Sequence, residues 1–428
     1  MFCDLNTERC KHLNLLLDER SKRGLLQLSM ILSKPLIEIG IIVAGLLDEI
    51  DEQATSLAVK STLSFLQDHF PDFEFDLFIV RRPELVDAKV VQPSVLLQRA
   101  VEERDFRHWD YSFVLTDADL DRYYSAHCFA ALSRPLDAAV LSFSLIDPVA
   151  VGETADATSR VQRVAHRLSR LMLHSLSHLS GLGVSDDPTN LMSRPADAKG
   201  LDAMESLTEV QILQQQLSFI EVADQRLEES SGHRLSKTAF ALRAAWINHR
   251  EIFEAIVAAR PWQFPRRLSG LTLASVSTVA VLLMTAEAWD LALSESWTCL
   301  ALLSVTAWLL TTGYVIVRQQ LLVRHGNRTT EQSVVTAASA IGIVVVGMLV
   351  TWTCLCLIGI TVSGSLFGAN LIVSWAASSD LSPQDVGVLL KIKMSLFIAS
   401  IGLLIGALGA SFESQHYFRH VIFVDEEV

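Results

Sequence analysis

Apolar and charged residues divide this chain into two unlike parts. Beyond Arg267 four long runs carry no charge: Leu268–Ala286, Trp297–Val317, Ser333–Ser379 and Met394–Phe412. Each is long enough to cross a hydrocarbon core as a helix. The third run exceeds one span, so we expect four spans plus a re-entrant or interfacial piece. This pattern predicts an all-α transmembrane bundle over residues 268–412, followed by a tail over 413–428.

Basic residues near the first two runs predict the orientation. Three arginines precede the first run, three more follow the second, and the loop between the runs is acidic: Arg260, Arg266, Arg267, Arg318, Arg324, Arg328, and Glu287, Asp290, Glu295. By the positive-inside rule the N-terminal half is cytoplasmic and the chain is an integral protein of an inner or plasma membrane. Lys391 and Lys393 fit five spans better than four, which leaves the side of the C-terminus open.

The part before the membrane alternates strand and helix patterns. We expect strands at Leu36–Ala44, Phe73–Ile79, Tyr111–Thr116 and Ala138–Leu145, and helices around Val59–Phe70, Val95–Arg104 and Thr158–Ser180. This order predicts an α/β (α+β) domain over residues 36–221. An N-terminal helical segment (1–35) precedes it, and a helical juxtamembrane stalk (222–267) follows it.

Composition and the chain's first residues exclude several classes. The formal net charge is −13 and the pI is about 5.4, without the clustered basic face that nucleic-acid binding needs. The scattered charges of the first twenty residues do not resemble a secretory signal. The six cysteines lack the dense spacing of a disulfide scaffold, so we expect free thiols.

Two histidines supply the candidate chemistry. His174 and His178 stand four residues apart on the predicted helix at 158–180, so their side chains lie on one face, where both could bind one metal ion. The pair alone is weak evidence, because such spacing also occurs on ordinary polar helix faces. His166, two turns earlier, is too far along the helix to share the metal.

The sequence after these histidines resembles the metzincin metalloprotease pattern HExxHxxGxxH with its Met-turn. Gly181 and Met192 fall in register with the turn glycine and the Met-turn methionine, and the closest match is the archaemetzincin family. The resemblance covers roughly residues 36–217. It implies a zincin domain with a mixed twisted sheet, an antiparallel edge strand at about Ala138–Leu145, and both histidines facing a cleft.

The departures from the family pattern indicate a degenerate site. Ser175 stands at the position of the family's general-base glutamate, and Val184 stands at that of its third histidine ligand. Asp186 is a possible substitute ligand. The four cysteines of the family's structural zinc site correspond to Ser185, Asn190, Val210 and Leu213. Serine cannot replace the carboxylate as general base, and two imidazoles hold zinc weakly, so we expect no catalytic residues and either no zinc or weakly bound zinc.

The functional hypothesis is therefore a membrane-anchored metalloprotease homologue without activity, a pseudoenzyme that binds an unknown peptide or protein. Strand addition in the cleft is one possible mode. One alternative is an active zinc metallopeptidase with altered ligands. The other is a transporter or channel subunit regulated by the soluble domain. Gly402, Gly406 and Gly409 form a helix-packing face that could also support homo-oligomers in the bilayer.

Overall fold

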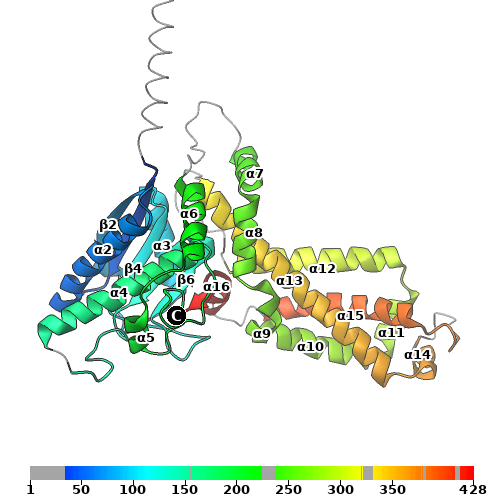
Figure 1. The fold of residues 1–428 in the computed structure, drawn as a ribbon. Coiled ribbons are helices and arrows are strands. Elements are labelled where there is room, and N and C mark those ends of the chain that lie inside the picture. Colours follow the sequence, from blue (N-terminus) through cyan, green and yellow to red (C-terminus); the bar gives the residue numbers. More distant parts are fainter. Residues whose placement is uncertain are drawn as a thin grey trace, which may run out of the picture.

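The structure, a computed structural model, describes residues 34–154, 156–223, 237–319, 321, 331–376, 378, 382–409 and 415–428. Figure 1 shows a layered α/β part beside an elongated bundle of helices. The N-terminal segment expected at 1–35 lies almost wholly outside the described residues. The domain boundaries at 221 and 267 stay predictions.

A six-stranded sheet forms the centre of the α/β part, in the order β2-β1-β4-β7-β6-β8. Strands β1, β2, β4 and β7 are parallel, whereas β6 is antiparallel to both β7 and β8. The strands are β1 (Leu36–Ala44), β2 (Glu74–Arg82), β4 (Tyr111–Thr116), β6 (Ala130–Ser133), β7 (Ala138–Ser142) and β8 (Glu426–Glu427). β3 (Val90–Val91) and β5 (Asp119–Leu120) form a separate pair. The expected mixed sheet is confirmed.

The expected antiparallel edge strand at Ala138–Leu145 is wrong. Ala138–Ser142 pairs in parallel with Tyr111–Thr116, and the antiparallel strand is the preceding Ala130–Ser133. Only the short turn η2 (Arg134–Leu136) and Asp137 separate β6 from β7. A connection of that length permits only an antiparallel pair, because a parallel crossover needs a dozen or more residues.

Helices cover both faces of the sheet. α2 (Glu49–His69) and α4 (Ala157–Leu179) pack together on one face, where α6 (Glu209–Ala223) completes the larger core. α3 (Pro93–Arg107) and α16 (Gln415–Phe423) pack on the other face. Each of these faces has its own cluster of buried apolar side chains, so the inner strands β1, β4, β6 and β7 are buried on both sides and consist mostly of apolar residues.

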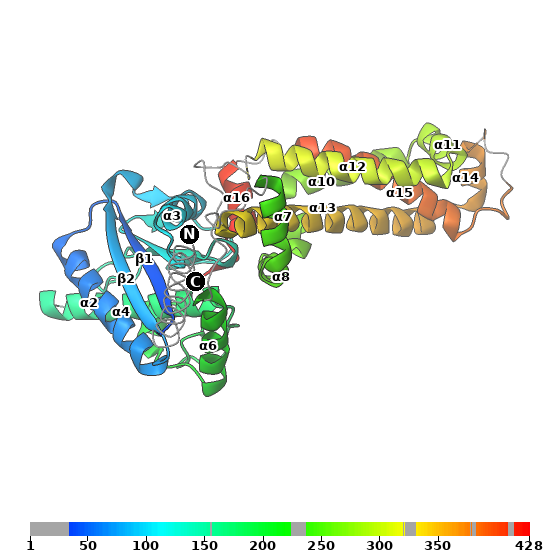
Figure 2. The same cartoon turned by 90° about the horizontal axis from the view of Figure 1, so that it is seen from above.

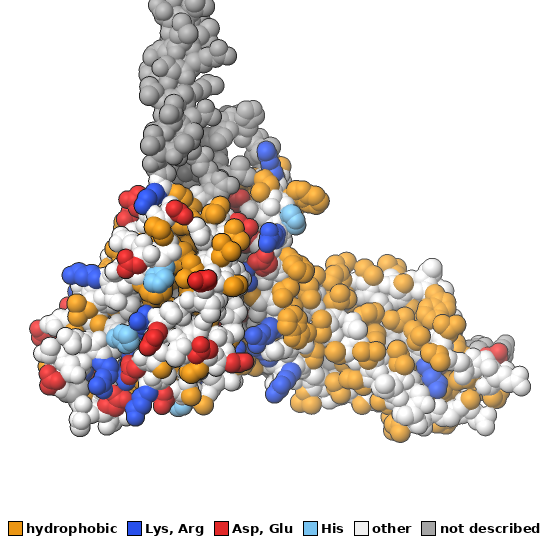
Figure 3. All heavy atoms as spheres, in the orientation of Figure 1, with side chains coloured by type: hydrophobic (Ala, Val, Ile, Leu, Met, Phe, Trp, Pro, Cys, Tyr) orange, Lys and Arg blue, Asp and Glu red, His pale blue; other side chains and the backbone are white. Residues whose placement is uncertain are grey.

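The second part contains the helices that can enter a membrane. α12 (Trp297–Arg318), residues 333–366 of α13 (Glu331–Leu366) and α15 (Val388–Gly409) are each long and apolar enough to cross one, and the bent pair His249–Arg267 and Ser269–Leu283 would give a fourth span. The remaining helices are α5 (Ala198–Ala203), α7 (Lys237–Ile247), α8 (His249–Ala258), α9 (Phe264–Arg267), α10 (Ser269–Leu283), α11 (Ala286–Ser294) and α14 (Ala369–Trp375). Hydrophobic side chains dominate the visible face of this part, whereas charged side chains mark the other (Figure 3).

The helices α10 and α15 have bounds that differ from those of the spans expected from the sequence. α10 is 15 residues long, shorter than the expected Leu268–Ala286, and bends by 53° from the preceding helices. α15 begins at Val388, so it includes Lys391 and Lys393, which the expected run at Met394–Phe412 excluded. The Lys393 ammonium donates a hydrogen bond to the Leu293 carbonyl over 2.6 Å, which satisfies a charge inside the bundle.

The glycines of α15 let it approach α10 closely. A Cβ atom at Gly406 would lie 3.0 Å from the Leu271 carbonyl oxygen, and one at Gly409 would lie 2.6 Å from that of Gly270. These positions confirm a small-residue packing face within one chain.

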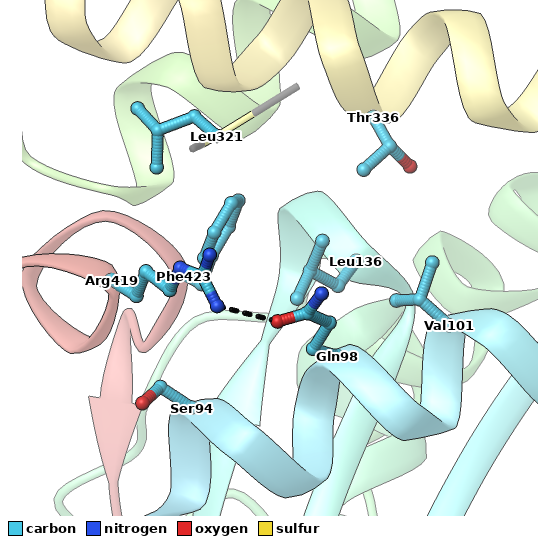
Figure 4. Close-up of a pocket in the computed structure, with 8 residues that line it drawn as sticks. All are labelled: Ser94, Gln98, Val101, Leu136, Leu321, Thr336, Arg419 and Phe423. Atoms are coloured by element: carbon cyan, nitrogen blue, oxygen red, sulfur yellow. Dashed lines mark hydrogen bonds between the residues drawn. The ribbon is translucent and has the colours of Figure 1, made fainter. Parts of the chain in front are cut away.

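After α15 the chain returns to the sheet. α16 lies between the two parts in both views (Figures 1 and 2). Figure 4 shows a hollow of about 100 Å³ at this junction, where the Arg419 guanidinium donates to Gln98 Oε1 on α3 over 2.6 Å. Tyr417 donates its hydroxyl hydrogen to the Arg267 carbonyl over 2.6 Å. α16 therefore contacts both the sheet domain and the helical bundle.

Phe219 on α6 provides a test of the larger core. Its fully buried ring packs against Phe70, Phe73 and Phe75 at centroid distances of 5.1, 5.7 and 5.5 Å. We expect Phe219→Ala to reduce the stability of the sheet domain by about 3–5 kcal/mol, because it leaves a cavity among three rings. Hydrogen exchange of the β1 amides in detergent micelles measures this loss.

The matched control is Val210→Ala on the same helix, where the side chain is 75% exposed. It should change the stability by about 0.5 kcal/mol or less. Equal losses in the two variants would contradict the packing of α6 described above.

Candidate functional site

Helix α4 positions the candidate histidines. Val161, Val164, Leu168 and Leu171 form its buried stripe against the sheet, and the histidine pair follows on its last two turns. The helix ends at Leu179, close to the expected Ser180. Gly181 follows with φ of +89°, in the left-handed region that favours glycine, and a Cβ there would lie 2.5 Å from Arg134 Nη2.

His174 is completely buried and held in one tautomer. Its Nδ1 lies 2.7 Å from the Leu191 carbonyl oxygen, which can only accept, so Nδ1 carries the hydrogen. Burial lowers the pKa of His174 to about 4, which leaves the ring neutral at physiological pH. Nε2 therefore keeps a lone pair, and it has no hydrogen-bond partner among the described residues.

The turn around Met192 holds the Leu191 carbonyl that accepts the hydrogen bond from His174. Met192 is fully buried, its amide donates to Asn190 Oδ1 over 2.8 Å, and its carbonyl accepts from the Ser185 amide over 2.8 Å. The Leu191 amide donates to the Ser206 carbonyl over 2.9 Å. Hydrogen bonds thus hold the loop in which the archaemetzincin resemblance places Ser185 and Asn190 at structural zinc positions.

His178 has two carboxylates against its ring. Nε2 lies 3.0 Å from Asp425 Oδ2, and Nδ1 lies 3.1 Å from Glu426 Oε2. Arg194 Nε also donates to Glu426, over 2.8 Å. Because each nitrogen faces an acceptor, the ring is an imidazolium with no free lone pair.

The pKa values of this cluster agree with its geometry. Burial alone would lower the pKa of His178, but Asp425 and Glu426 raise it to about 9. Burial alone would raise the pKa of Glu426, but His178 and Arg194 lower it to about 2. The ion pair of His178 and Glu426 is therefore charged between about pH 2 and about pH 9. Its stabilising effect is lost as the pH falls through the pKa of Glu426 and as the pH rises through the pKa of His178.

The carboxylate of Glu427 lies in a separate anion-binding site, next to the cluster of His178, Asp425 and Glu426. Its buried carboxylate accepts from the amides of Tyr123, Tyr124 and Ser125 over 2.8–2.9 Å and from His420 Nε2 over 2.8 Å. Burial would raise the pKa of Glu427, but His420 and these amides lower it to about 2. Successive backbone N–H groups of this kind form a concave anion site.

Main-chain hydrogen bonds fix the same segment along β6. Strand β8 pairs Glu426 with Leu132 and Glu427 with Ala131. The Asp425 amide donates to the Leu132 carbonyl over 3.1 Å, the Val428 amide donates to that of Ala130 over 2.8 Å, and the Phe129 amide donates to the Val428 carbonyl over 2.6 Å. An extended segment thus occupies the edge of the sheet beside the histidines.

The other residues that the sequence proposed for the site do not take part in the ion pairs of His178. Ser175 is buried, and its Oγ donates to the Leu171 carbonyl over 2.7 Å within the same helix. Val184 is 41% exposed, and Asp186 is exposed in the following loop. Two hollows lie between the sheet domain and the helices, with volumes of about 100 and 540 Å³, and neither is lined by His174 or His178.

The residues present do not fit a tetrahedral zinc site. His174 offers one lone pair at Nε2, but His178 Nε2 donates to Asp425, the carboxylate of Glu426 lies 3.1 Å from His178 Nδ1, and a valine side chain has no atom that could bind zinc. Zinc binding would require the removal of Asp425 and Glu426 from His178 and the loss of a proton.

Sequence reasoning missed the partners of His178. Asp425, Glu426 and Glu427 belong to a segment treated only as a tail, and Arg194 and His420 were not considered. The available signal was three successive acidic residues directly after the apolar Val421–Val424. That pattern predicts no particular contact, because the segment is 247 residues from His178 in the chain.

No protein-family model matches this sequence, and no curated protein has a matching sequence. Solved structures give partial matches. An archaemetzincin from Methanopyrus kandleri is 15% identical with a TM-score of 0.34 over 44% of this chain and 97% of its own. A zinc-dependent peptidase from Methanocorpusculum labreanum is 15% identical with a TM-score of 0.34 over 41% of this chain and 99% of its own. Because identities and TM-scores are low, these similarities identify no activity here.

Zinc content tests the fit of this site. The wild-type chain should be purified with well under one zinc ion per chain, because His178 is occupied by carboxylates. Val184→His should raise the zinc affinity most, since the resemblance places this residue at the third-ligand position and its side chain is partly exposed. Ser175→Glu should change the affinity little. Plasma emission spectroscopy of the chain in detergent measures the metal.

His174→Ala in the Val184→His background is the control, and it should return the zinc content to the wild-type value. Full zinc occupancy of the wild-type chain would contradict the assignment of His178 to an ion pair.

Proposed function

We propose that this chain is a membrane-anchored, archaemetzincin-like protein whose soluble domain holds an extended peptide segment at the edge of its sheet without hydrolysing it. The observation that carries this proposal is the pairing of β8 with β6 beside His178. Strand addition of this type is a general mode of peptide recognition, in which main-chain hydrogen bonds provide affinity and side-chain sites provide selectivity.

Two features support the lack of hydrolysis. The Ser175 hydroxyl donates to its own helix, and no carboxylate stands there to accept a proton from an attacking water molecule. His178 Nε2 donates to Asp425 and Nδ1 lies 3.1 Å from the Glu426 carboxylate, so the ring is not available as a metal ligand. Zinc, where it is bound, would supply Lewis-acid activation of water, and these residues are not arranged to hold it.

The path of the chain supports an even number of membrane crossings. Residues 415–428 contact α3 and β6 of the sheet domain, so both segments that flank the bundle lie on one side. This arrangement favours four spans over five. The arginines before α10 and after α12 support a cytoplasmic location for that side.

The first test is an assay for peptide hydrolysis. The wild-type chain, supplied with zinc and a peptide library, should give no more cleavage than His174→Ala, because it lacks the general base and a complete ligand set. Mass spectrometry of the library detects products. Cleavage by the wild type that disappears in His174→Ala would contradict the proposal and favour a metallopeptidase with altered ligands.

Topology is tested separately by cysteine labelling. A cysteine placed at Asp290, between α10 and α12, should react with an impermeant maleimide added outside intact cells, because the acidic loop is expected on that side. A cysteine at Glu84, which is exposed on the sheet domain, should react only after lysis. The reverse pattern would show that the sheet domain is not cytoplasmic.

A further inference from the structure

The acidic segment, Asp425–Val428, fits its surroundings side chain by side chain. Asp425 contacts His178 and also accepts from the Arg134 amide over 3.4 Å, and Glu426 contacts His178 and Arg194. The side chains of Asp425 and Glu426 are 2% and 5% exposed. Two different cationic side chains therefore meet the first two carboxylates of the segment.

The last two residues are bound by different means. Glu427, whose side chain is 1% exposed, lies in the backbone N–H site at Tyr123–Ser125. Val428 joins the apolar core beneath the sheet. The pattern recognised is thus three consecutive carboxylates followed by an apolar side chain.

We propose that this edge of the sheet is a receptor for an extended acidic peptide of that pattern, and that the acidic segment is its resident intramolecular ligand. The inference rests on the proposed peptide-holding function and names the ligand class. An external peptide with the same pattern binds the same site and competes with the resident segment.

Charge complementarity favours an acidic peptide over other occupants. Without the acidic segment, His178 and Arg194 would stand together at an open strand edge, beside three backbone N–H groups that point at one carboxylate. A neutral peptide leaves these N–H donors and Arg194 without carboxylate partners and supplies no anion to keep His178 protonated, and a basic peptide is repelled by Arg194. β6 supplies the main-chain partners for any extended strand, so selectivity comes from the carboxylates.

Binding of a labelled peptide tests the proposal. The probe is Val-Asp-Glu-Glu-Val, the sequence of residues 424–428, and the protein is the full chain in lipid nanodiscs. The variant Asp425→Ala/Glu426→Ala/Glu427→Ala loses the resident carboxylates but keeps His178, Arg194 and the backbone site. Fluorescence anisotropy should give an affinity roughly tenfold or more above that of the wild type, because intramolecular competition is removed.

Matched controls distinguish recognition of the carboxylates from a non-specific effect of removing three charged side chains from the protein. Glu74→Ala/Asp76→Ala/Glu84→Ala removes three exposed carboxylates at the opposite edge and should bind the probe as the wild type does. The neutral peptide Val-Asn-Gln-Gln-Val should bind the opened variant roughly tenfold or more weakly than the probe, the factor that one charge-assisted hydrogen bond represents. Arg194→Ala in the opened variant should weaken probe binding but not neutral-peptide binding.

Equal binding of the acidic and neutral peptides, or no binding to a folded opened variant, would overturn the inference. If that variant fails to fold, hydrogen exchange in the wild type decides: excess probe should accelerate exchange of the amides of residues 425–428, and unchanged exchange overturns the proposal. The outcomes stay distinct, because failure of the proposed function appears as His174-dependent cleavage, whereas failure of this inference leaves cleavage at background.

Discussion

The closure of β8 on β6 brings together the parts of this molecule that the sequence separates. It adds a strand to the sheet, places two carboxylates against the ring of His178, and connects the end of the helical bundle to the sheet domain. The ion pairs are buried, so their net free energy depends on complete pairing: charges that lose their partners in such a place are costly. His178, Arg194, Asp425 and Glu426 meet this requirement together.

The difference between His174 and His178 shows how surroundings decide the chemistry of identical side chains. His174 is neutral because burial penalises its charged form and lowers its pKa, whereas the pKa of His178, one helical turn later, is raised because two carboxylates lie against its ring. A metal site needs two neutral rings with lone pairs directed at one point. This helix presents one neutral ring and one imidazolium, an arrangement suited to binding an anionic segment.

Much of the sheet domain followed from local patterns. Leu36–Ala44 and Tyr111–Thr116 are strands with the expected bounds, and the long helix before Gly181 was recognised from its apolar stripe. The antiparallel strand Ala130–Ser133 was missed, because four residues without alternation carry little signal, and the antiparallel pairing was expected at the neighbouring Ala138–Leu145 instead. In the site, His174, His178 and Met192 could be named from their spacing. Asp425 and Glu426 could not, because their contacts depend on the return of the chain after the last membrane helix.

The chain order of β6 and β8 has a consequence for biosynthesis. β6 leaves the ribosome long before β8, and the apolar helices α10, α12, α13 and α15 are made between them. During that interval the edge of the sheet has no strand partner, and an open edge is a template for pairing with other chains. The sheet domain can therefore complete its outermost strand only after the helical bundle has been made, so the last step of its folding follows the synthesis of the apolar helices.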